Sequence, residues 1–120
     1  MINRVASRRV EVKDGDQPVA AAEVTTAEGT ARASLHATPG HTPPGSRASL
    51  VDAIMDTPEV QASTRLEATV PLGDGESLKR LRERTENAVI RPAGSTALLD
   101  ANIPPAKPPG ATQQSPGRQP

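Results

Sequence analysis

Phenylalanine, tyrosine and tryptophan are all absent from this sequence. Aromatic side chains normally bury about 150 to 250 Å² each, so a core here must be built from valine, leucine, isoleucine, alanine and methionine. Such a core is thin, and we expect either modest stability or a partner that covers more of the surface. The absence also removes the aromatic platforms on which exposed nucleic-acid bases stack.

Cysteine is absent as well, which excludes disulfides, thiolate metal sites and a cysteine nucleophile. No apolar run approaches the roughly 20 residues of a membrane span, and residues 1–7 lack the apolar region of a secretory signal. Lysine is rare beside arginine, which together with abundant alanine, glycine and proline indicates a GC-rich bacterial gene. We therefore expect a cytoplasmic bacterial protein that has no membrane contact.

The charges balance, with 14 basic and 14 acidic residues and a formal net charge of zero at pH 7. Such a balance predicts no nucleic-acid partner and no polybasic membrane anchor. The basic run Lys79–Arg84 is interrupted by Glu83, and we interpret it as a solvated helix surface.

Composition divides the chain into three parts. Residues 1–7 predict a flexible amino terminus, and residues 8–103 predict a single small α/β domain. Residues 104–120 are rich in proline, glycine and glutamine and contain almost no large apolar side chain. Because such a segment cannot offset the entropy lost on ordering, we predict a disordered tail.

Alternating apolar and polar residues predict three strands in the first third of the chain, at residues 8–13, 19–25 and 30–38. The turn signals Asp14-Gly15 and Glu28-Gly29 separate them. These strands form a predicted antiparallel meander. A helix is expected next, with Thr42 as its N-cap, prolines in its first turn and its end near Asp56. Its apolar stripe consists of Leu50, Val51, Ile54 and Met55.

A strand, a helix and a strand follow between Arg65 and Ile103. Leu66, Ala68 and Val70 alternate with polar residues in the first of these strands. In the helix, one face is formed by Leu78, Leu81, Thr85 and Ala88. The last strand covers residues 97–103 and is expected to run parallel to the first, because a helix joins the two.

The predicted order is therefore β-β-β-α-β-α-β, an α+β two-layer sandwich with a mixed sheet and with its helices mainly on one face. Every strand has one polar face, which favours an open sheet face without helices. We regard that face as a candidate functional surface. Its candidate residues are Arg32, His36, Arg65, Glu67 and Asp100.

The glycine and proline segment before the first helix is a second candidate, because a helix N-terminus offers free N–H groups and a favourable dipole to an anion. The candidate ligand-binding residues are His41, Gly45, Ser46 and Arg47. Simple helix capping is the competing interpretation, since prolines remove N–H donors.

The sequence gives weaker support for catalysis and for metal binding. Ser34 or Ser49, His36 and Asp100 do not have the spacing of a nucleophile elbow, and we predict no catalytic residue. Asp52 and Asp56 lie four apart on a predicted helix, but an oxygen-rich cation site needs more ligands. We therefore predict no metal.

The order of elements from about Val19 to Ile103 resembles the later part of the GNAT acyltransferase superfamily. In that family a Gln/Arg-x-x-Gly-x-Gly/Ala segment holds the pyrophosphate of acyl-CoA. The corresponding positions here are Thr42, Gly45 and Arg47, of which only Gly45 fits. The family's usual tyrosine near the last helix has no counterpart, nor has its helical segment before the first strands.

Taken together, these features favour a small non-enzymatic binding domain without a cofactor. It would act as a homodimer or with a protein partner, through its open sheet face or an edge strand. The alternative is a degenerate GNAT-like protein that binds acyl-CoA at Gly45 and the neighbouring amides, or an acyltransferase.

Overall fold

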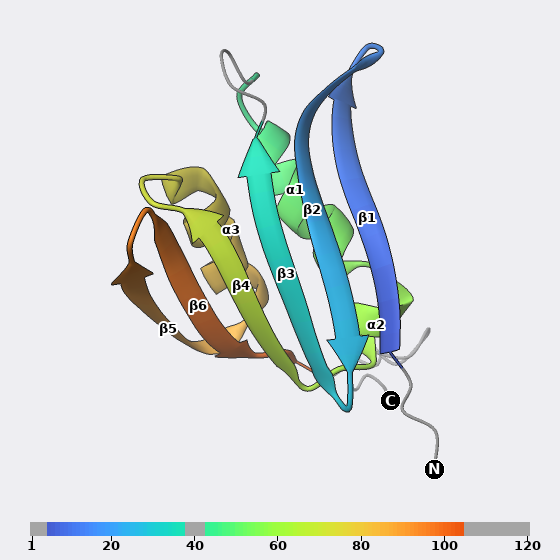
Figure 1. The fold of residues 1–120 in the computed structure, drawn as a ribbon, viewed down its shortest axis with the longest axis vertical. Coiled ribbons are helices and arrows are strands. Elements are labelled where there is room, and N and C mark those ends of the chain that lie inside the picture. Colours follow the sequence, from blue (N-terminus) through green and yellow to red (C-terminus); the bar gives the residue numbers. More distant parts are fainter. Residues whose placement is uncertain (1–4, 38–42, 105–120) are drawn as a thin grey trace, which may run out of the picture.

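The computed structural model describes residues 5–37 and 43–104. A six-stranded sheet runs through this part of the chain in the order β1-β2-β3-β4-β6-β5 (Figure 1). The elements are β1 (Val5–Asp14), β2 (Gln17–Ala27), β3 (Thr30–Ala37), α1 (Ser46–Met55), α2 (Pro58–Gln61), β4 (Arg65–Pro71), α3 (Gly75–Arg84), β5 (Glu86–Ala93) and β6 (Thr96–Asn102).

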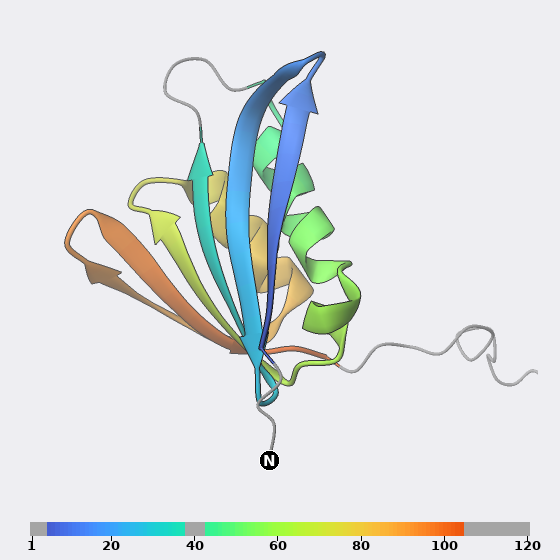
Figure 2. The same cartoon turned by 45° about the vertical axis from the view of Figure 1, so that its right-hand side comes forward.

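The helices all lie on one face of the sheet, and the other face is open (Figures 1 and 2). The predicted α+β class, with a mixed sheet and helices on one side, is therefore confirmed. The strands β1, β2 and β3 form the predicted antiparallel meander. β3 and β4 are parallel, because α1 and α2 carry the chain back to the starting end of the sheet.

The last quarter of the fold differs from the prediction. α3 ends at Arg84, so Thr85 and Ala88, which the sequence pattern predicts on the helix face, lie beyond it, and residues 86–93 form β5. Thr85 adopts extended angles, and its hydroxyl donates to the carbonyl of Leu81 at 2.7 Å. The β-branched pair Val89 and Ile90 follows, and such residues pack well in strands.

β5 also changes the direction of the strand after it. β6 lies between β4 and β5 and is antiparallel to both. The prediction that β4 and the last strand run parallel is therefore wrong. The expected helix is followed by a hairpin, so the chain reverses once more before it pairs with β4.

α1 begins later than predicted. Its N-cap is Gly45, which has a φ of 86°, and the helix starts at Ser46. Pro43 and Pro44 precede the helix and do not fill its first turn. The predicted N-cap Thr42 lies outside the described residues, as does the predicted tail apart from Pro104. β1 begins at Val5, earlier than the predicted start at Arg8.

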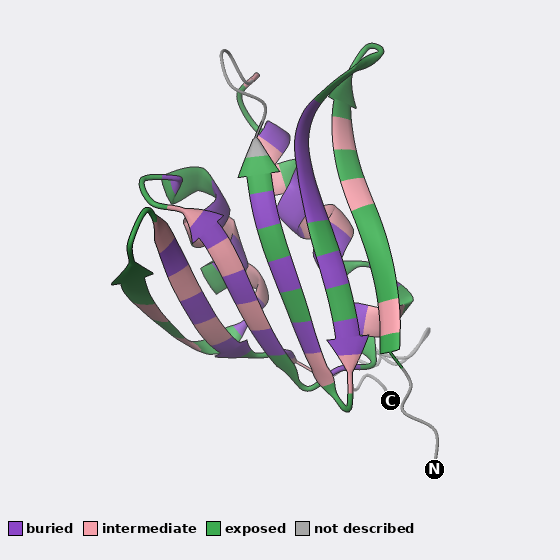
Figure 3. Cartoon of the chain, viewed as in Figure 1, coloured by how far each residue is buried: buried purple, intermediate pink, exposed green. Residues whose placement is uncertain are grey.

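The core lies between the sheet and the helices. The sheet contributes alanines, including Ala20, Ala22, Ala31 and Ala33, together with larger side chains such as Leu66, Val70 and Leu99. Figure 3 shows buried residues alternating with exposed ones along β3 and with partly buried ones along β4, as the period-two pattern predicts. In β2, residues 19–22 are all buried, and the alternation begins only at Glu23.

Val60 in α2 is completely buried and belongs to this core. Within residues 5–37 and 43–104, the helices are all too short or too polar to cross a membrane.

Candidate functional site

β3 and β4 separate at one end of the sheet. Their pairing runs from Thr30 and Arg65 to Ser34 and Thr69 and then stops. β3 continues to Ala37 and β4 to Pro71, yet the two strands make no further pairs in the described part of the chain. Figure 1 shows their carboxyl ends diverging. The sheet therefore opens in its middle. Among the described residues, the main-chain groups on the facing edges of β3 and β4 have no ladder partner there, while β3 stays paired with β2 and β4 with β6.

Both longer helices start at this same end of the molecule. Gly45 precedes α1 in a left-handed conformation, and no side chain of α1 caps its start. A side chain at Gly45 would meet nothing within 4 Å, so the space in front of the helix is open. The helix dipole makes this end of α1 favourable for negative charge.

Residues at the start of α3 and just before it reach across to the start of α1. The main-chain N–H of Ala48 donates to Oε2 of Glu76 at 2.9 Å. Nη1 of Arg47 lies 3.3 Å from Oδ1 of Asp74, whose side chain is only 4% exposed. Asp74 also accepts hydrogen bonds from the N–H and the hydroxyl of Ser77, at 3.1 and 2.7 Å. These bonds hold the two helix starts in one fixed arrangement.

Nε of Arg47 is buried and has no hydrogen-bond partner in the described part of the structure. A buried donor without a partner is costly, because it has lost its water without replacement. Arg47 therefore has one charge-bearing donor unused at the start of α1. The sequence singled out Gly45, Ser46 and Arg47 for this location, and the structure places them together there. His41 lies outside the described residues.

Farther along, an ion-pair network joins α1 to α3. Arg80 donates to both carboxylate oxygens of Asp52, at 2.8 and 3.1 Å. Arg84 donates to Asp52 at 2.7 Å and to Asp56 at 2.8 Å. The hydrogen bonds from Arg80, and then those from Arg84, lower the pKa of Asp52 below its ordinary value. The network is a structural link between helices.

The same observation bears on metal binding. Asp52 and Asp56 bind guanidinium groups in this arrangement. Nowhere among residues 5–37 and 43–104 do three or more metal-ligating side chains form a group.

On the open face, the candidate residues form cross-strand ion pairs. Arg32 on β3 donates to Glu67 on β4 at 2.9 Å. Arg65 on β4 donates to Asp100 on β6 at 2.6 Å. The exposed side chain of His36 lies farther along β3 and forms no hydrogen bond with the described residues. A Ser-His-Asp arrangement is not formed among the described residues, since Asp100 binds Arg65.

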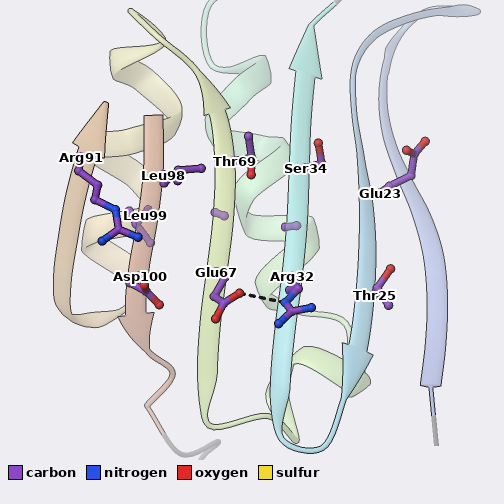
Figure 4. A pocket seen from close by; sticks show the side chains of 12 residues that line it. Glu23, Thr25, Arg32, Ser34, Glu67, Thr69, Arg91, Leu98, Leu99 and Asp100 are labelled. Carbon is purple, nitrogen blue, oxygen red and sulfur yellow. Dashed lines mark hydrogen bonds and ion pairs between the residues drawn. The ribbon is translucent and has the colours of Figure 1, made fainter. Parts of the chain in front are cut away.

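A shallow hollow of about 380 Å³ lies on this face, over the paired part of β3 and β4 that ends at Ser34 and Thr69 (Figure 4). Its walls come from β2, β3, β4, β5 and β6. The lining residues are Glu23, Thr25, Arg32, Ala33, Ser34, Glu67, Ala68, Thr69, Arg91, Leu98, Leu99 and Asp100.

Sequence reasoning misses three contributors to these surfaces: Asp74, Glu76 and Arg91. The pattern around Asp74 indicates only a turn, although an aspartate before a helix is a common N-cap. Without a prediction of β5, sequence reasoning assigns Arg91 to the same basic surface as the preceding helix. Its position on the open face follows only from the observed pairing of Arg91 with Leu98.

No family model and no curated protein sequence matches this chain. Solved structures do match. A GNAT-family acetyltransferase from Streptococcus pneumoniae superimposes with a TM-score of 0.54 at 13% identity, over 77% of this chain and 64% of that chain. A proposed acetyltransferase from Salmonella typhimurium, solved with its cofactor acetyl-CoA, gives a TM-score of 0.55 at 10% identity, over 82% of this chain and 64% of that chain. A proposed acetyltransferase from Sphaerobacter thermophilus DSM 20745 gives a TM-score of 0.54 at 16% identity, over 84% of this chain and 67% of that chain.

The chain thus has a GNAT-like fold, as the resemblance in the order of its elements predicts. It spans about two thirds of the length of these structures. The prediction of a non-enzymatic binding domain is wrong, because the matching structures are acetyltransferases and favour the acyltransferase alternative.

Proposed function

We propose that this protein binds acyl-CoA and acts as an acyltransferase. The observation that carries the proposal is the separation of β3 and β4 beside the open start of α1. The opening offers a passage for an extended chain, and the helix start offers donors for a phosphate group. One of the similar structures contains acetyl-CoA as its cofactor.

The residues at the start of α1 fit the anionic end of such a ligand. Gly45 presents no side chain that would block the approach of a phosphate to the main chain. Arg47 has a buried Nε without a partner in the described structure, and a guanidinium binds phosphate oxygens with good geometry. We propose Gly45, Ser46 and Arg47 as the residues that hold the pyrophosphate.

When bound, acyl-CoA supplies a thioester whose acyl carbon is open to attack by a nucleophile. This chain contributes orientation and hydrogen bonding. Beyond Ser34, the main-chain groups of β3 that point toward β4 have no partner in the described residues of β4. We propose that such N–H groups donate to the acyl carbonyl, where charge develops during transfer.

The proposal extends to the setting of the protein. We retain a cytoplasmic bacterial location, which suits a ligand made in the cytoplasm. We also retain the prediction of a homodimer or a protein partner, now through the open sheet face alone because both sheet edges are charged or irregular. Native mass spectrometry tests self-association directly.

Acyl-CoA binding is tested by titrating the isotope-labelled protein with acetyl-CoA and recording amide NMR shifts, since the chain has no aromatic side chain for fluorescence. We expect saturable shifts at Gly45, Ser46 and Arg47 and at the ends of β3 and β4. Gly45→Asp should abolish them by placing a carboxylate in front of the helix. Acyl transfer itself is tested by following the release of free CoA thiol in the presence of a panel of amines.

Gly15→Asp is the matched control. Gly15 also has a positive φ, of 65°, and its side-chain position is equally empty, but it lies in the turn between β1 and β2. It should leave binding unchanged. If the unmodified protein shows no saturable shift with acetyl-CoA, the proposal is wrong.

A further inference from the structure

Arg91 is an uncompensated cation on the open sheet face. It lies on β5 opposite Leu98 of β6, and it forms no ion pair or hydrogen bond with any residue that the structure describes. Asp100 lines the same hollow as Arg91 (Figure 4) but binds Arg65 at 2.6 Å instead.

The other charges around Arg91 are paired. The hollow of about 380 Å³ is lined by Glu23, which pairs with Arg9, and by Glu67, which pairs with Arg32. A second hollow of about 330 Å³ adjoins it and contains the pair formed by Arg65 and Asp100. The two hollows share Arg91, Leu98 and Asp100. Among the described residues, their combined lining therefore carries one unpaired positive charge.

The surface beside Arg91 is partly apolar. Val89, two residues earlier on the same strand, is 61% exposed, and Leu98 stands on the neighbouring strand and lines both hollows. On the other side of the larger hollow, Ser34 and Thr69 face each other as the last pair between β3 and β4. Their hydroxyls have no hydrogen-bond partner among the described residues.

We propose that this face binds a small carboxylic acid with a short apolar body. The carboxylate pairs with Arg91, whose guanidinium matches its two oxygens. The apolar body covers Val89 and Leu98, and a polar group at its far end reaches the hydroxyls of Ser34 and Thr69. A phosphate ligand fits less well, because one guanidinium balances only one of its negative charges.

The charged end of this site lies away from the proposed pyrophosphate site, whereas Ser34 and Thr69 adjoin the opening between β3 and β4 that the acyl-CoA proposal uses. Arg91, Val89 and Leu98 belong to β5 and β6, whereas Gly45 and Arg47 stand at the start of α1. The open face and the helix layer lie on opposite sides of the sheet (Figure 2). Loss of hexanoate binding in Arg91→Gln and loss of acetyl-CoA binding in Gly45→Asp can therefore be told apart.

The experiment compares three probes of nearly the same size in amide NMR titrations of the full chain: hexanoate, hexanamide and hexylammonium. We expect hexanoate to shift the amides of Arg91, Leu98 and Thr69 with a Kd on the order of 1 mM, the range that ligand efficiency sets for so small a molecule. Hexanamide and hexylammonium should bind at least about tenfold more weakly, since they lack the charge that Arg91 neutralises.

Arg91→Gln should weaken hexanoate binding by about tenfold or more. Arg82→Gln is the matched control, because Arg82 is an exposed arginine in the last turn of α3 and forms no ion pair with the described residues. It should leave the affinity unchanged.

Equal affinity for hexanoate and hexanamide would overturn the proposal, because charge would then play no part. So would tighter binding of hexylammonium or of inorganic phosphate, or shifts confined to the starts of α1 and α3. Because these comparisons use the unmodified protein, they decide the matter even if Arg91→Gln fails to fold.

Discussion

Oε2 of Glu76 on α3 accepts a hydrogen bond of 2.9 Å from the main-chain N–H of Ala48 in the first turn of α1. One helix thus supplies the carboxylate that caps the other. The bond uses a donor that an anion approaching the start of α1 would need. It places a negative charge at the location proposed for the pyrophosphate of acyl-CoA.

The first prediction is that Glu76→Gln strengthens acetyl-CoA binding. Removing a negative charge near a helix N-terminus should lower the Kd by about fivefold, since repulsion is lost and the Ala48 donor competes less with the ligand. The Kd is measured by NMR titration. Glu86→Gln, an exposed substitution on β5 outside this location, serves as control. A Kd that is unchanged or higher in Glu76→Gln would contradict the proposed arrangement.

The second prediction concerns acid stability. The pKa of Asp52 in the folded protein lies below its ordinary value of 3.8 because Arg80 and Arg84 bind the ionised form. Its stabilising contribution is therefore complete above the pKa of the unfolded chain and is lost as the pH falls through the folded-state pKa. Asp52→Asn should reduce the free energy of unfolding at neutral pH by about 1 kcal/mol, a modest value because 35% of the side chain is exposed and screened by solvent.

Urea unfolding followed by far-UV circular dichroism measures this effect between neutral pH and pH 2. The difference between Asp52→Asn and the unmodified protein should shrink progressively below about pH 4, as the pH falls through the unfolded-state pKa of Asp52 and then through its lower folded-state pKa. Asp16→Asn changes the same charge in the turn between β1 and β2 and should cost little at any pH. A difference that stays constant down to pH 2 would show that charge is not the cause.

The third prediction concerns the core. Leu66 on β4 is completely buried, and without aromatic residues each large aliphatic side chain carries a greater share of the packing. Leu66→Ala should lower the free energy of unfolding by about 3 kcal/mol, from lost burial and a residual cavity. Leu72→Ala removes the same atoms from a residue that is 55% exposed and should change it by less than about 0.5 kcal/mol. Similar losses in the two variants would contradict this description of the core.

The fourth prediction distinguishes backbone strain from steric clash as the effect of substituting two glycines. Gly45 has a φ of 86°, whereas Gly75 at the start of α3 has an ordinary φ, and a Cβ atom at either position would have no neighbour within 4 Å. Gly45→Ala should therefore destabilise the protein by about 1 to 2 kcal/mol through backbone strain alone. Gly75→Ala should be neutral or slightly stabilising. Thermal unfolding by circular dichroism compares them, and equal midpoints would argue against the left-handed cap.

The strands with one buried face were predictable because their side chains alternate strictly, as Leu66, Ala68 and Val70 do in β4. β5 was not predictable in the same way. In the sequence, charged residues continue through Glu86 and extend the helical pattern of α3. In the structure, Asn87 has a φ of 58°, and a bulge interrupts the pairing of β5 with β6 before Val89. The informative signal was the β-branched pair Val89 and Ile90 before a proline and a glycine.

The site was predictable only in part. Alternation was enough to place Arg32, Arg65 and Asp100 on a common face, but their partners depend on strand order and register. Since β6 lies beside β4 rather than at the edge, Asp100 meets Arg65. The contact between Arg47 and Asp74 depends on how two helices pack, which neither local sequence contains.

The two edges of the sheet have a consequence for behaviour at high concentration. β5 is irregular before Val89 and carries Pro92, which cannot donate a main-chain hydrogen bond. β1 presents Arg8, Arg9, Glu11 and Lys13 along the opposite edge. Proline, bulges and charged residues at sheet edges oppose the stacking of strands from one molecule onto the next. The molecule therefore leaves one sheet face open to ligands while both of its borders resist growth into fibrils.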